Sequence, residues 1–378
     1  MGQFFTVNSD YILQNLEKYV KNKVVTDPFA GSGDLLRWAK KCDAKSIKGH
    51  EIDKKYIDNK NVYKNDSILK PLKYKFVLTN PPYLNINKAK QQVKETYFSK
   101  FKFEDLYQIS LFSIMDSDEG IAIVPINFLS AENSKEIRKI FFSKFTILEM
   151  NYFRHQVFSD TTYNVIAFYY KKNGKDDKFS IKTRIYPEDK TVNITLEQKF
   201  DWTIAGDFLK VIKNQKNILG IRRLTVKDIP EIRKGVNIPV AYNHVKNVTR
   251  IQVSKDLYDD VIKNNIILLK AIDSGTENGK IALENIKKYG VECLISKPTS
   301  RHMIYLVFDK RISISDQEKI VELFNKEIEK MRNDYFSLFL TNYRDNDRKR
   351  ISFDFVYKFL NYLYFNHINN QRTANLFS

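Results

Sequence analysis

The chain has 378 residues, of which 43% are hydrophobic, and it carries a formal net charge of +18. This length favours two domains, and the positive charge favours a polyanionic partner such as nucleic acid, or else a solvated lysine-rich surface. The two cysteines, Cys42 and Cys293, are too far apart for a disulfide framework or a metal-ligand motif. No run approaches the roughly 20 apolar residues of a membrane span, and no signal peptide precedes the polar start, so we expect a soluble, cytoplasmic protein.

The first half of the chain alternates short β-rich runs with helical patterns, which predicts an α/β fold with a parallel sheet between helices. In chain order we expect strands at 24–26, 46–50, 61–63, 76–79, 120–125 and 165–170, and helices at 34–41, 106–115 and 134–142. The polar stretch 171–178 is typical of a hairpin tip or a short insert.

The sheet rhythm fades beyond about residue 200, so we place a domain boundary there and expect domains at 1–200 and 201–378. In the second domain, Ser315 and Glu318 have the spacing of a helix capping box. Ile320, Phe324 and Ile328 follow at helical spacing, which predicts an amphipathic helix. No internal repeat is apparent.

The tetrapeptide Asn80-Pro81-Pro82-Tyr83 directly follows the expected strand 76–79. It provides an amide, two rigid prolines and an aromatic ring at the carboxyl edge of the sheet, where open α/β sheets bind ligands. Such a group can hold a planar amine by accepting its N–H bonds. The alternative is an ordinary turn, because Asn and Pro are common turn residues.

A second motif, residues 27–33, directly follows the first expected strand and carries Gly31 and Gly33. Glycines allow the backbone to approach a ligand closely, but the spacing is not that of a pyrophosphate-binding loop. Glu51, about 20 residues further on, has the position of a ribose-binding acid, and Asp66 could accept from an adenine amine. A nucleoside with an uncharged or cationic tail fits this set, and S-adenosylmethionine is the obvious candidate. Taken singly, Asp27 could be a turn residue, Glu51 a surface acid and Asp66 an N-cap.

With these motifs in this order, the chain resembles the S-adenosylmethionine-dependent amino-methyltransferases of DNA, and within them the gamma-class adenine-N6 enzymes of restriction–modification systems. The resemblance covers about residues 2–170 and rests on the following segments: Gly2-Gln3-Phe4-Phe5-Thr6, 27–33, Glu51-Ile52-Asp53, Asn65-Asp66, Asn80-Pro81-Pro82-Tyr83, Asp105-Leu106-Tyr107, 123–128 and Gln156-Val157-Phe158-Ser159. The tail resembles the family's recognition region more loosely, through residues 232–236 and 341–344.

The resemblance implies a Rossmann-like methyltransferase sheet with helices on both faces, followed by a smaller mixed α+β target-recognition domain. It also implies a cofactor site that includes Thr6, which would lie near the methionine moiety. The whole implied cofactor-binding set is Thr6, Asp27, Phe29, Ala30, Gly31, Gly33, Glu51, Ile52, Asp66 and Asn80.

For catalysis, the resemblance implies that the Asn80 side-chain oxygen and the Pro81 carbonyl accept the two N–H bonds of an adenine amine flipped out of duplex DNA. Pro82 completes the rigid turn, and Tyr83 and Phe158 would stack on the extruded base. Positioning then accounts for most of the rate, without a separate general base. For His50 and His155 we expect a solvent or core role.

Basic residues of the tail are candidates for contact with DNA phosphates, or for a merely solvated patch. The candidate set is Arg233, Lys234, Arg301, Arg344, Arg348, Lys349 and Arg350, and Arg222 and Arg223 are further basic residues of this region. We expect double-stranded DNA as partner, a monomeric enzyme, and a separate restriction endonuclease beside it. The lysine-rich segment 85–102 is expected to be a mobile, DNA-facing loop or a solvated surface run.

Other functions fit parts of the pattern. Cytosine-N4 methylation is the nearest alternative, although Ser commonly replaces Asn80 in such enzymes. The same tetrapeptide occurs in enzymes that methylate RNA or protein glutamine, although these are usually shorter. A catalytically idle DNA-binding subunit is a further alternative, which the complete tetrapeptide and Glu51 disfavour.

Overall fold

The computed structural model describes residues 6, 8–158, 164–173, 176–273, 279–335, 341–344 and 348–369, with the side chains of 341–344 and 348 excluded. The chain divides into two compact units, Met1–Gly206 with Thr341–Asp347, and Asp207–Leu340 with Arg348–Ser378. The segment Gly2 to Phe5, which contributes to the family resemblance, lies outside the described residues.

The first unit is built on a nine-stranded sheet of order β3-β2-β1-β4-β5-β7-β6-β8-β9. Neighbouring strands from β3 through β5 run parallel, whereas β7 runs antiparallel to both β5 and β6. This confirms the α/β prediction. The strands are β1 (Val24–Asp27), β2 (Ser46–Glu51), β3 (Val62–Lys64), β4 (Tyr74–Thr79), β5 (Ser117–Pro125), β6 (Phe145–Phe153), β7 (Val165–Lys172), β8 (Lys178–Tyr186) and β9 (Lys190–Glu197).

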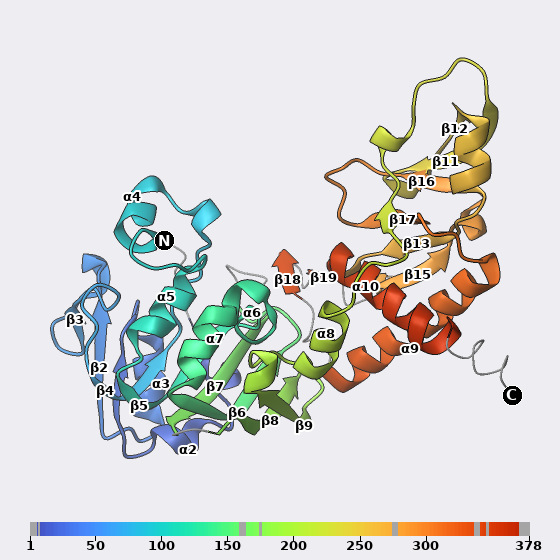
Figure 1. The fold of residues 1–378 in the computed structure, drawn as a ribbon. Helices are drawn as coiled ribbons and strands as arrows, with labels where there is room; N and C mark the ends of the chain where they lie inside the picture. The colour runs from blue at the N-terminus through green and yellow to red at the C-terminus, as the bar shows by residue number, and fades with distance from the viewer. Residues whose placement is uncertain are drawn as a thin grey trace, which may run out of the picture. The chain divides into compact units, whose positions relative to one another are not determined.

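Helices cover both faces of this sheet, with α5, α6 and α7 in front and α3 behind in the view of Figure 1. Side chains 120–125 of β5 and 165–170 of β7 are buried without alternation, because both of their faces are covered. The helices and helical turns are α1 (Ser9–Ile12), α2 (Glu17–Val20), α3 (Asp34–Lys41), η1 (Lys54–Tyr56), η2 (Ile86–Lys88), α4 (Gln91–Val93), η3 (Lys94–Phe98), α5 (Leu106–Ser113), α6 (Asn127–Ser130), η4 (Glu132–Ser134), α7 (Lys135–Phe142) and η5 (Gln198–Phe200).

Strands β6, β8 and β9 were not predicted from the sequence. In β6, polar residues interrupt the apolar run. One of them, Asn151, is fully buried, and its side-chain amide donates to the carbonyl oxygens of Ile12 and Gln14 at 3.1 and 2.9 Å. Since β6 lies between β7 and β8 in the sheet, the stretch 171–178 does not close a hairpin between them. The hairpin interpretation of that stretch is therefore wrong.

The second unit combines two small sheets, an antiparallel pairing of β14 with β19, and helices. One sheet has the order β10-β17-β13-β15 and the other has the order β12-β11-β16. The elements are α8 (Gly206–Lys213), β10 (Ile221–Arg223), η6 (Val226–Asp228), β11 (Val236–Tyr242), β12 (His244–Val253), η7 (Leu257–Ile262), β13 (Ile267–Lys270), β14 (Ile272–Asp273), β15 (Ala282–Asn285), η9 (Ile286–Tyr289), β16 (Cys293–Ile295), β17 (Met303–Phe308), α9 (Ile314–Tyr335), β19 (Arg348–Arg350), α10 (Phe353–Leu363) and η10 (Tyr364–Asn369). Strand β18 (Thr341–Arg344) falls in the segment assigned to the first unit.

The expected amphipathic helix is present as α9, with Ile320, Phe324 and Ile328 buried. Its start differs from the prediction, because Ser315 lies inside the helix. The residue that caps it is Ser313, whose side-chain oxygen accepts the backbone N–H of Asp316 at 3.1 Å. The capping box at Ser315 and Glu318 is therefore wrong.

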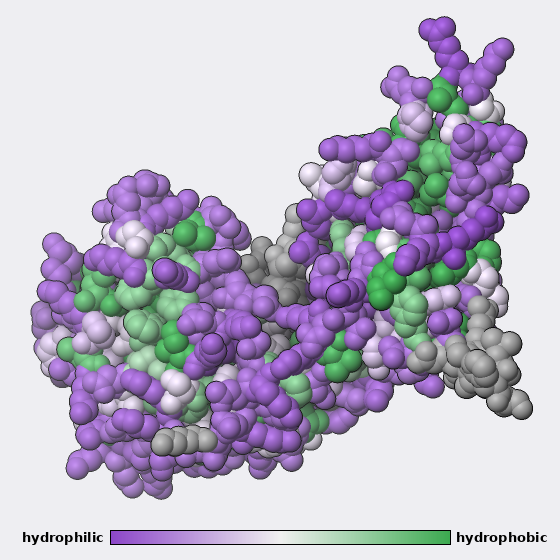
Figure 2. All heavy atoms as spheres, viewed as in Figure 1, coloured by the Kyte–Doolittle hydropathy of each residue, from purple (hydrophilic) through white to green (hydrophobic). Residues whose placement is uncertain are grey.

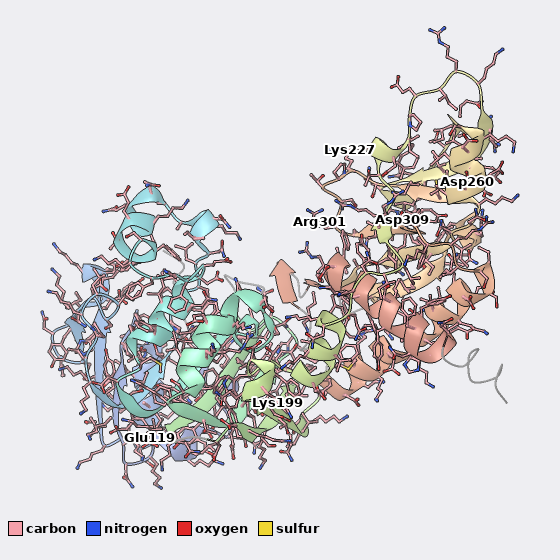
Figure 3. All side chains as sticks on the ribbon, in the orientation of Figure 1. Glu119, Lys199, Lys227, Asp260, Arg301 and Asp309 are labelled. Carbon is pink, nitrogen blue, oxygen red and sulfur yellow. The ribbon has the colours of Figure 1, made fainter. Side chains whose placement is uncertain are left out.

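Polar side chains cover most of the surface of both units in the view of Figure 2. In the second unit, Arg301 and Lys227 lie toward one side and Asp260 toward the other (Figure 3). None of the helices within the described ranges is long and apolar enough to cross a membrane. Those ranges also contain no group of three or more His, Cys, Asp or Glu residues arranged to hold a metal ion.

Candidate active site

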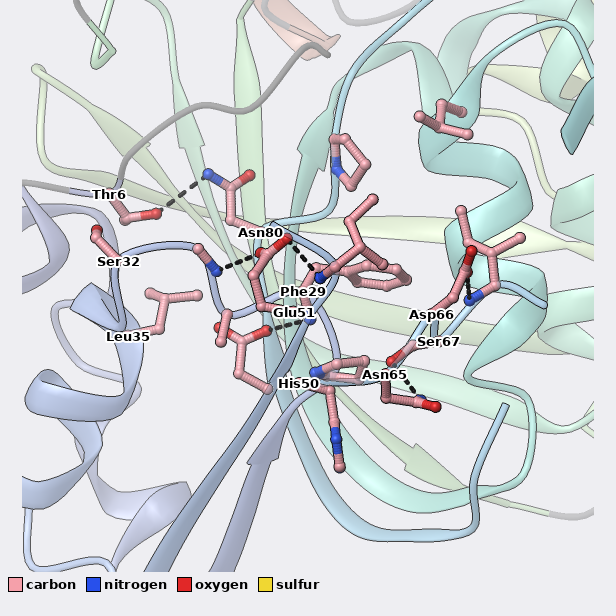
Figure 4. Close-up of a pocket in the computed structure, with 18 of the residues that line it drawn as sticks. Thr6, Phe29, Ser32, Leu35, His50, Glu51, Asn65, Asp66, Ser67 and Asn80 are labelled. Carbon is pink, nitrogen blue, oxygen red and sulfur yellow. Dashed lines mark hydrogen bonds between the residues drawn. The ribbon is translucent and has the colours of Figure 1, made fainter. Parts of the chain in front are cut away.

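A pocket of about 890 Å³, which includes space open to solvent, lies at the carboxyl ends of β1, β2 and β4. Figure 4 shows how the side chains from these strand ends and from the following turns surround it. The lining residues are Thr6, Asp27, Pro28, Phe29, Ala30, Gly31, Ser32, Asp34, Leu35, His50, Glu51, Ile52, Asn65, Asp66, Ser67, Ile68, Asn80, Pro82, Leu84, Val93, Tyr97 and Leu106. The Asn80 tetrapeptide and the glycine-containing turn thus open onto one cavity.

The turn after β1 is held by the side chain of Asp27. Its Oδ1 atom accepts the backbone N–H of Phe29 at 3.0 Å and the Thr79 hydroxyl at 2.9 Å, which ties the ends of β1 and β4 together. Gly31 and Gly33 have φ angles of +50° and +79°, in the region that favours glycine. A Cβ added to Gly33 would meet only one atom, at 3.6 Å. The positive φ of Gly33, rather than a close contact with a neighbouring atom, therefore explains why a glycine stands there.

Glu51 ends β2 and is fixed by three backbone N–H groups. Its Oε2 atom accepts from Gly31 at 2.9 Å, and its Oε1 atom accepts from Ile52 and Asp53 at 2.8 and 3.0 Å. The carboxylate is therefore oriented before any ligand arrives. Beside it, the Ile52 side chain is 39% exposed and forms part of the pocket wall.

Asp66 follows β3 and uses both of its oxygen atoms. Oδ1 accepts the backbone N–H groups of Ile68 and Leu69 at 3.1 and 3.0 Å, as an N-cap would. Oδ2 accepts the hydroxyl of Tyr97 at 2.9 Å. No helix begins here, so Asp66 holds a turn rather than capping a helix, and its side chain lines the pocket.

Asn80 is 8% exposed, and its amide is hydrogen-bonded at both ends. Its Nδ2 atom donates to the Thr6 hydroxyl at 3.1 Å, and its Oδ1 atom lies 2.6 Å from the Tyr83 hydroxyl. The same hydroxyl lies 2.9 Å from the carbonyl oxygen of Ile123 on β5. These contacts fix the amide plane and place the Tyr83 side chain inside the protein.

Two titratable groups of the pocket are shifted by burial. Burial raises the pKa of Asp27 to about 7, against the hydrogen bonds from Phe29 and Thr79 that lower it, and Glu51 and Asp34 raise it further. Burial, with a smaller effect of Lys48, lowers the pKa of His50, which favours the neutral imidazole. A cationic ligand in the pocket would stabilise the Asp27 carboxylate.

Most predicted cofactor residues line this pocket. Gly33 does not, and neither do the catalytic candidates Pro81, Tyr83 and Phe158. Tyr83 and Phe158 are 8% and 2% exposed. In this conformation neither ring offers an open face for base stacking, so stacking on a flipped base requires both side chains to move.

The mobile-loop interpretation of 85–102 is wrong for its central part, which is helical, whereas the alternative of a solvated surface run holds for its outer side. The segment folds into η2, α4 and η3, and its backbone bridges to Asp105 through Asn85. Val93 and Tyr97, one helical turn apart, line the pocket from here. The signal that could have shown this is the i, i+4 apolar spacing of these two residues within the lysine-rich run.

The structure separates the predicted DNA contacts into different classes. Arg233, Lys234 and Arg301 are exposed in loops of the second unit, and Arg350 is partly buried on β19. The side chains of Arg344 and Arg348 lie outside the described residues. Lys349 is only 4% exposed, so its ammonium group is not on a surface that a DNA phosphate reaches, and we withdraw it from the predicted contacts.

The neighbouring arginines Arg222 and Arg223 have structural roles. Arg222 forms ion pairs with Asp228 and Asp309, each at 3.1 Å. Arg223 donates to the carbonyl oxygens of Pro298 and Ser300 at 2.6 and 3.2 Å. Arg223 thereby shapes the loop that carries Arg301.

Similarity to solved structures is limited in extent. The chain is 14% identical to a modification subunit of a putative type I restriction enzyme from Vibrio vulnificus, with 56% of this chain and 52% of that chain covered and a TM-score of 0.40. It is 12% identical to the type IIG restriction endonuclease BpuSI, with 68% and 44% covered and a TM-score of 0.44. It is 17% identical to a type I restriction-modification methyltransferase subunit from Streptococcus thermophilus, with 48% of each chain covered and a TM-score of 0.35.

The chain spans about half the length of these solved proteins, with 52%, 44% and 48% of them covered. No match was found among curated proteins. A protein-family model does match, over the part of the chain that contains the pocket's strand ends and the tetrapeptide. Residues 7–158 are similar to the Eco57I restriction-modification methylases.

Proposed function

We propose that this chain is an S-adenosylmethionine-dependent DNA methyltransferase that methylates the N6 amine of adenine as the modification enzyme of a restriction–modification system. The observation that carries the proposal is that Asn80, Glu51 and Gly31 line one cavity. An amine-gripping amide and a nucleoside-binding acid then face the same ligand space. The similarity of residues 7–158 to restriction-modification methylases supports the same reaction class.

The chemistry of the pocket fits this cofactor. Its lining contains the carboxyl groups of Asp27, Asp34, Glu51 and Asp66, and among the residues that the structure describes it includes no Lys or Arg. Such a cavity disfavours a phosphate-bearing ligand and suits a ligand with sulfonium and ammonium charges. Glu51 is oriented to accept from ribose hydroxyls, and the exposed Ile52 offers an apolar surface to a purine ring.

When bound, S-adenosylmethionine supplies an electrophilic methyl group. The chain's own part is to hold the target amine, whose lone pair is delocalised into the adenine ring. The Asn80 Oδ1 atom and the Pro81 carbonyl would accept its two N–H bonds, which favours tetrahedral geometry at nitrogen and frees the lone pair for attack. The Tyr83 hydroxyl lies 2.6 Å from that Oδ1 atom, so it would share this oxygen with the incoming amine.

The target base has to leave the duplex to reach such a cavity. We assign the catalytic role to residues 1–200 and DNA recognition to residues 201–378, where Arg233, Lys234 and Arg301 are exposed. Their charge is suited to phosphate contact, which positions a protein on DNA without reading sequence. We further propose a monomer that acts beside a separate restriction endonuclease.

The test is methylation of host DNA by the expressed chain, scored by long-read sequencing for N6-methyladenine. We expect one modified DNA word with the parent protein and none with Asn80→Ala. The matched control is Asn87→Ala, because Asn87 is exposed and lies outside the pocket lining, and it should methylate like the parent. Modification of cytosine N4 would replace the adenine assignment, and absence of any modified base with the parent would refute the proposal.

A further inference from the structure

The end of the pocket that is formed by Asp66 contains a residue that the motif pattern does not predict. Tyr97, on η3, lines the cavity beside Asp66 and is 8% exposed. Its hydroxyl donates to Asp66 Oδ2 at 2.9 Å across 31 positions of the chain. This contact therefore joins the segment after the tetrapeptide to the turn after β3.

The contact sets how Asp66 presents its oxygen atoms to a ligand. Two backbone N–H groups hold Oδ1, and Tyr97 holds Oδ2 from one direction. Since a carboxylate oxygen can accept two hydrogen bonds, Oδ2 keeps one acceptor position for a donor in the pocket. Without the tyrosine hydroxyl, only one oxygen of Asp66 would have a hydrogen bond to orient it.

Tyr97 remains a donor across the physiological range. Burial raises its pKa, and so does its hydrogen bond to Asp66. The phenol is therefore protonated whenever the protein is folded near neutral pH. As a donor it occupies one acceptor position of Asp66 Oδ2 and leaves the other to a ligand.

The same helical segment supplies an apolar wall. Val93 lies one turn before Tyr97, and both line the pocket, as does Leu106 at the start of α5. The opposite side of the segment carries exposed polar residues, among them Lys88, Lys90 and Lys100. The segment thus has an inner side that lines the pocket and an outer side that is exposed to solvent.

We infer that Tyr97 is a positioning residue for the nucleoside end of the cofactor, and that the Tyr97–Asp66 pair selects a purine that carries an exocyclic amine. This inference rests on the proposed function and adds a specificity device to it. A 6-amino purine donates to the free position of Asp66 Oδ2, whereas a 6-oxo purine brings an acceptor against an acceptor. A site built to receive an N–H group discriminates strongly against an analogue that lacks it.

The test measures binding of two ligands by calorimetry: S-adenosylhomocysteine, and S-inosylhomocysteine, in which an oxo group replaces the 6-amine. The proteins are the parent, Tyr97→Phe, Tyr97→Ala and the matched control Tyr63→Phe. Tyr63 is 37% exposed, donates to the Lys60 carbonyl and is absent from the pocket lining. Thermal unfolding of each variant shows whether it is folded.

We expect the parent to bind the adenosyl ligand at least about a hundredfold more tightly than the inosyl ligand. Tyr97→Phe should weaken the binding of the adenosyl ligand by about tenfold and leave the affinity for the inosyl ligand nearly unchanged, since one hydrogen bond to a charged group is lost. Tyr97→Ala should lose the same discrimination between the two ligands. It should also weaken the binding of both, because the tyrosine ring no longer forms part of the apolar pocket wall. Tyr63→Phe should bind both ligands like the parent.

Two results would overturn the inference while leaving the proposed function intact: a Tyr97→Phe variant with parental affinity for both ligands, or one that loses affinity for both equally. Equal loss would indicate a purely structural hydroxyl. A parent protein that binds neither ligand would instead refute the proposed function, and the inference with it. The two failures are therefore distinguishable by the parent's own titration.

Discussion

The buried carboxyl group of Asp27 predicts a pH-dependent cofactor affinity. Asp27 is 1% exposed at the end of β1, and its pKa is raised to about 7 chiefly by burial. A ligand with an ammonium and a sulfonium group prefers the ionised carboxylate. Raising the pH through this value should therefore tighten binding, and binding should release a proton from Asp27.

The size of the effect follows from the ionised fraction of Asp27. With a pKa of about 7, roughly 3% of the protein is ionised at pH 5.5 and about half at pH 7.0. If only the ionised form binds, the apparent dissociation constant varies inversely with that fraction. It should fall about sixteenfold between these two pH values. The range stays below the pKa of an ordinary α-amino group, near 8, so the ligand's own charge is constant.

Calorimetric titration with S-adenosylmethionine at pH 5.5, 6.25 and 7.0, in two buffers of different ionisation enthalpy, gives both the affinity and the proton release. His50 complicates the profile, because protonation of this pocket residue at low pH would also repel a cation. The variant Asp27→Asn separates the two groups, since it should bind more weakly than the parent at pH 7.0 and lose most of the pH slope. An affinity that is flat over this range in the parent, or an unchanged slope in Asp27→Asn, would refute the reasoning.

Three further changes test the structure. Tyr83→Phe removes the hydroxyl beside Asn80, so the free energy of unfolding should fall by about 1–2 kcal/mol. Single-turnover methylation should slow by less than in Asn80→Ala. An unchanged melting temperature would contradict the hydrogen bond between Tyr83 and Asn80. Gly33→Ala should lower the free energy of unfolding by about 1–2 kcal/mol, because an alanine is strained at its positive φ. Gly290→Ala, at a φ of +68° with nothing within 4 Å of the added Cβ, should lower it by the same amount in thermal unfolding. No loss of stability in either variant would argue against backbone strain. Arg223→Ala should lower the melting temperature and weaken DNA binding in a filter assay, because the Pro298 and Ser300 carbonyls each lose one of the two arginine donors that hold the loop. Parental binding would exclude that role.

Strands β1 to β5 and β7 and helices α3, α5 and α7 could be predicted because local pattern and tertiary environment agree there, whereas β6, β8 and β9 were not predicted. Helix α3 has the predicted bounds, since residues 35, 36, 38 and 39 form one buried face of an otherwise polar segment. Strand β6 could not be predicted, because its buried Asn151 is satisfied by carbonyl groups more than 130 positions away. Local propensity does not contain such a partner.

For the site, the sequence alone determined which chemistry is present: an amide before two prolines, a glycine turn, and acids that follow successive strands. Their meeting in one cavity also follows from sequence, because parallel strands bring their carboxyl ends to the same edge of a sheet. Only the tertiary structure decided the direction of individual side chains. Packing turned Tyr83 inward, buried Lys349 and brought Tyr97 against Asp66, since these orientations depend on contacts between residues far apart along the chain.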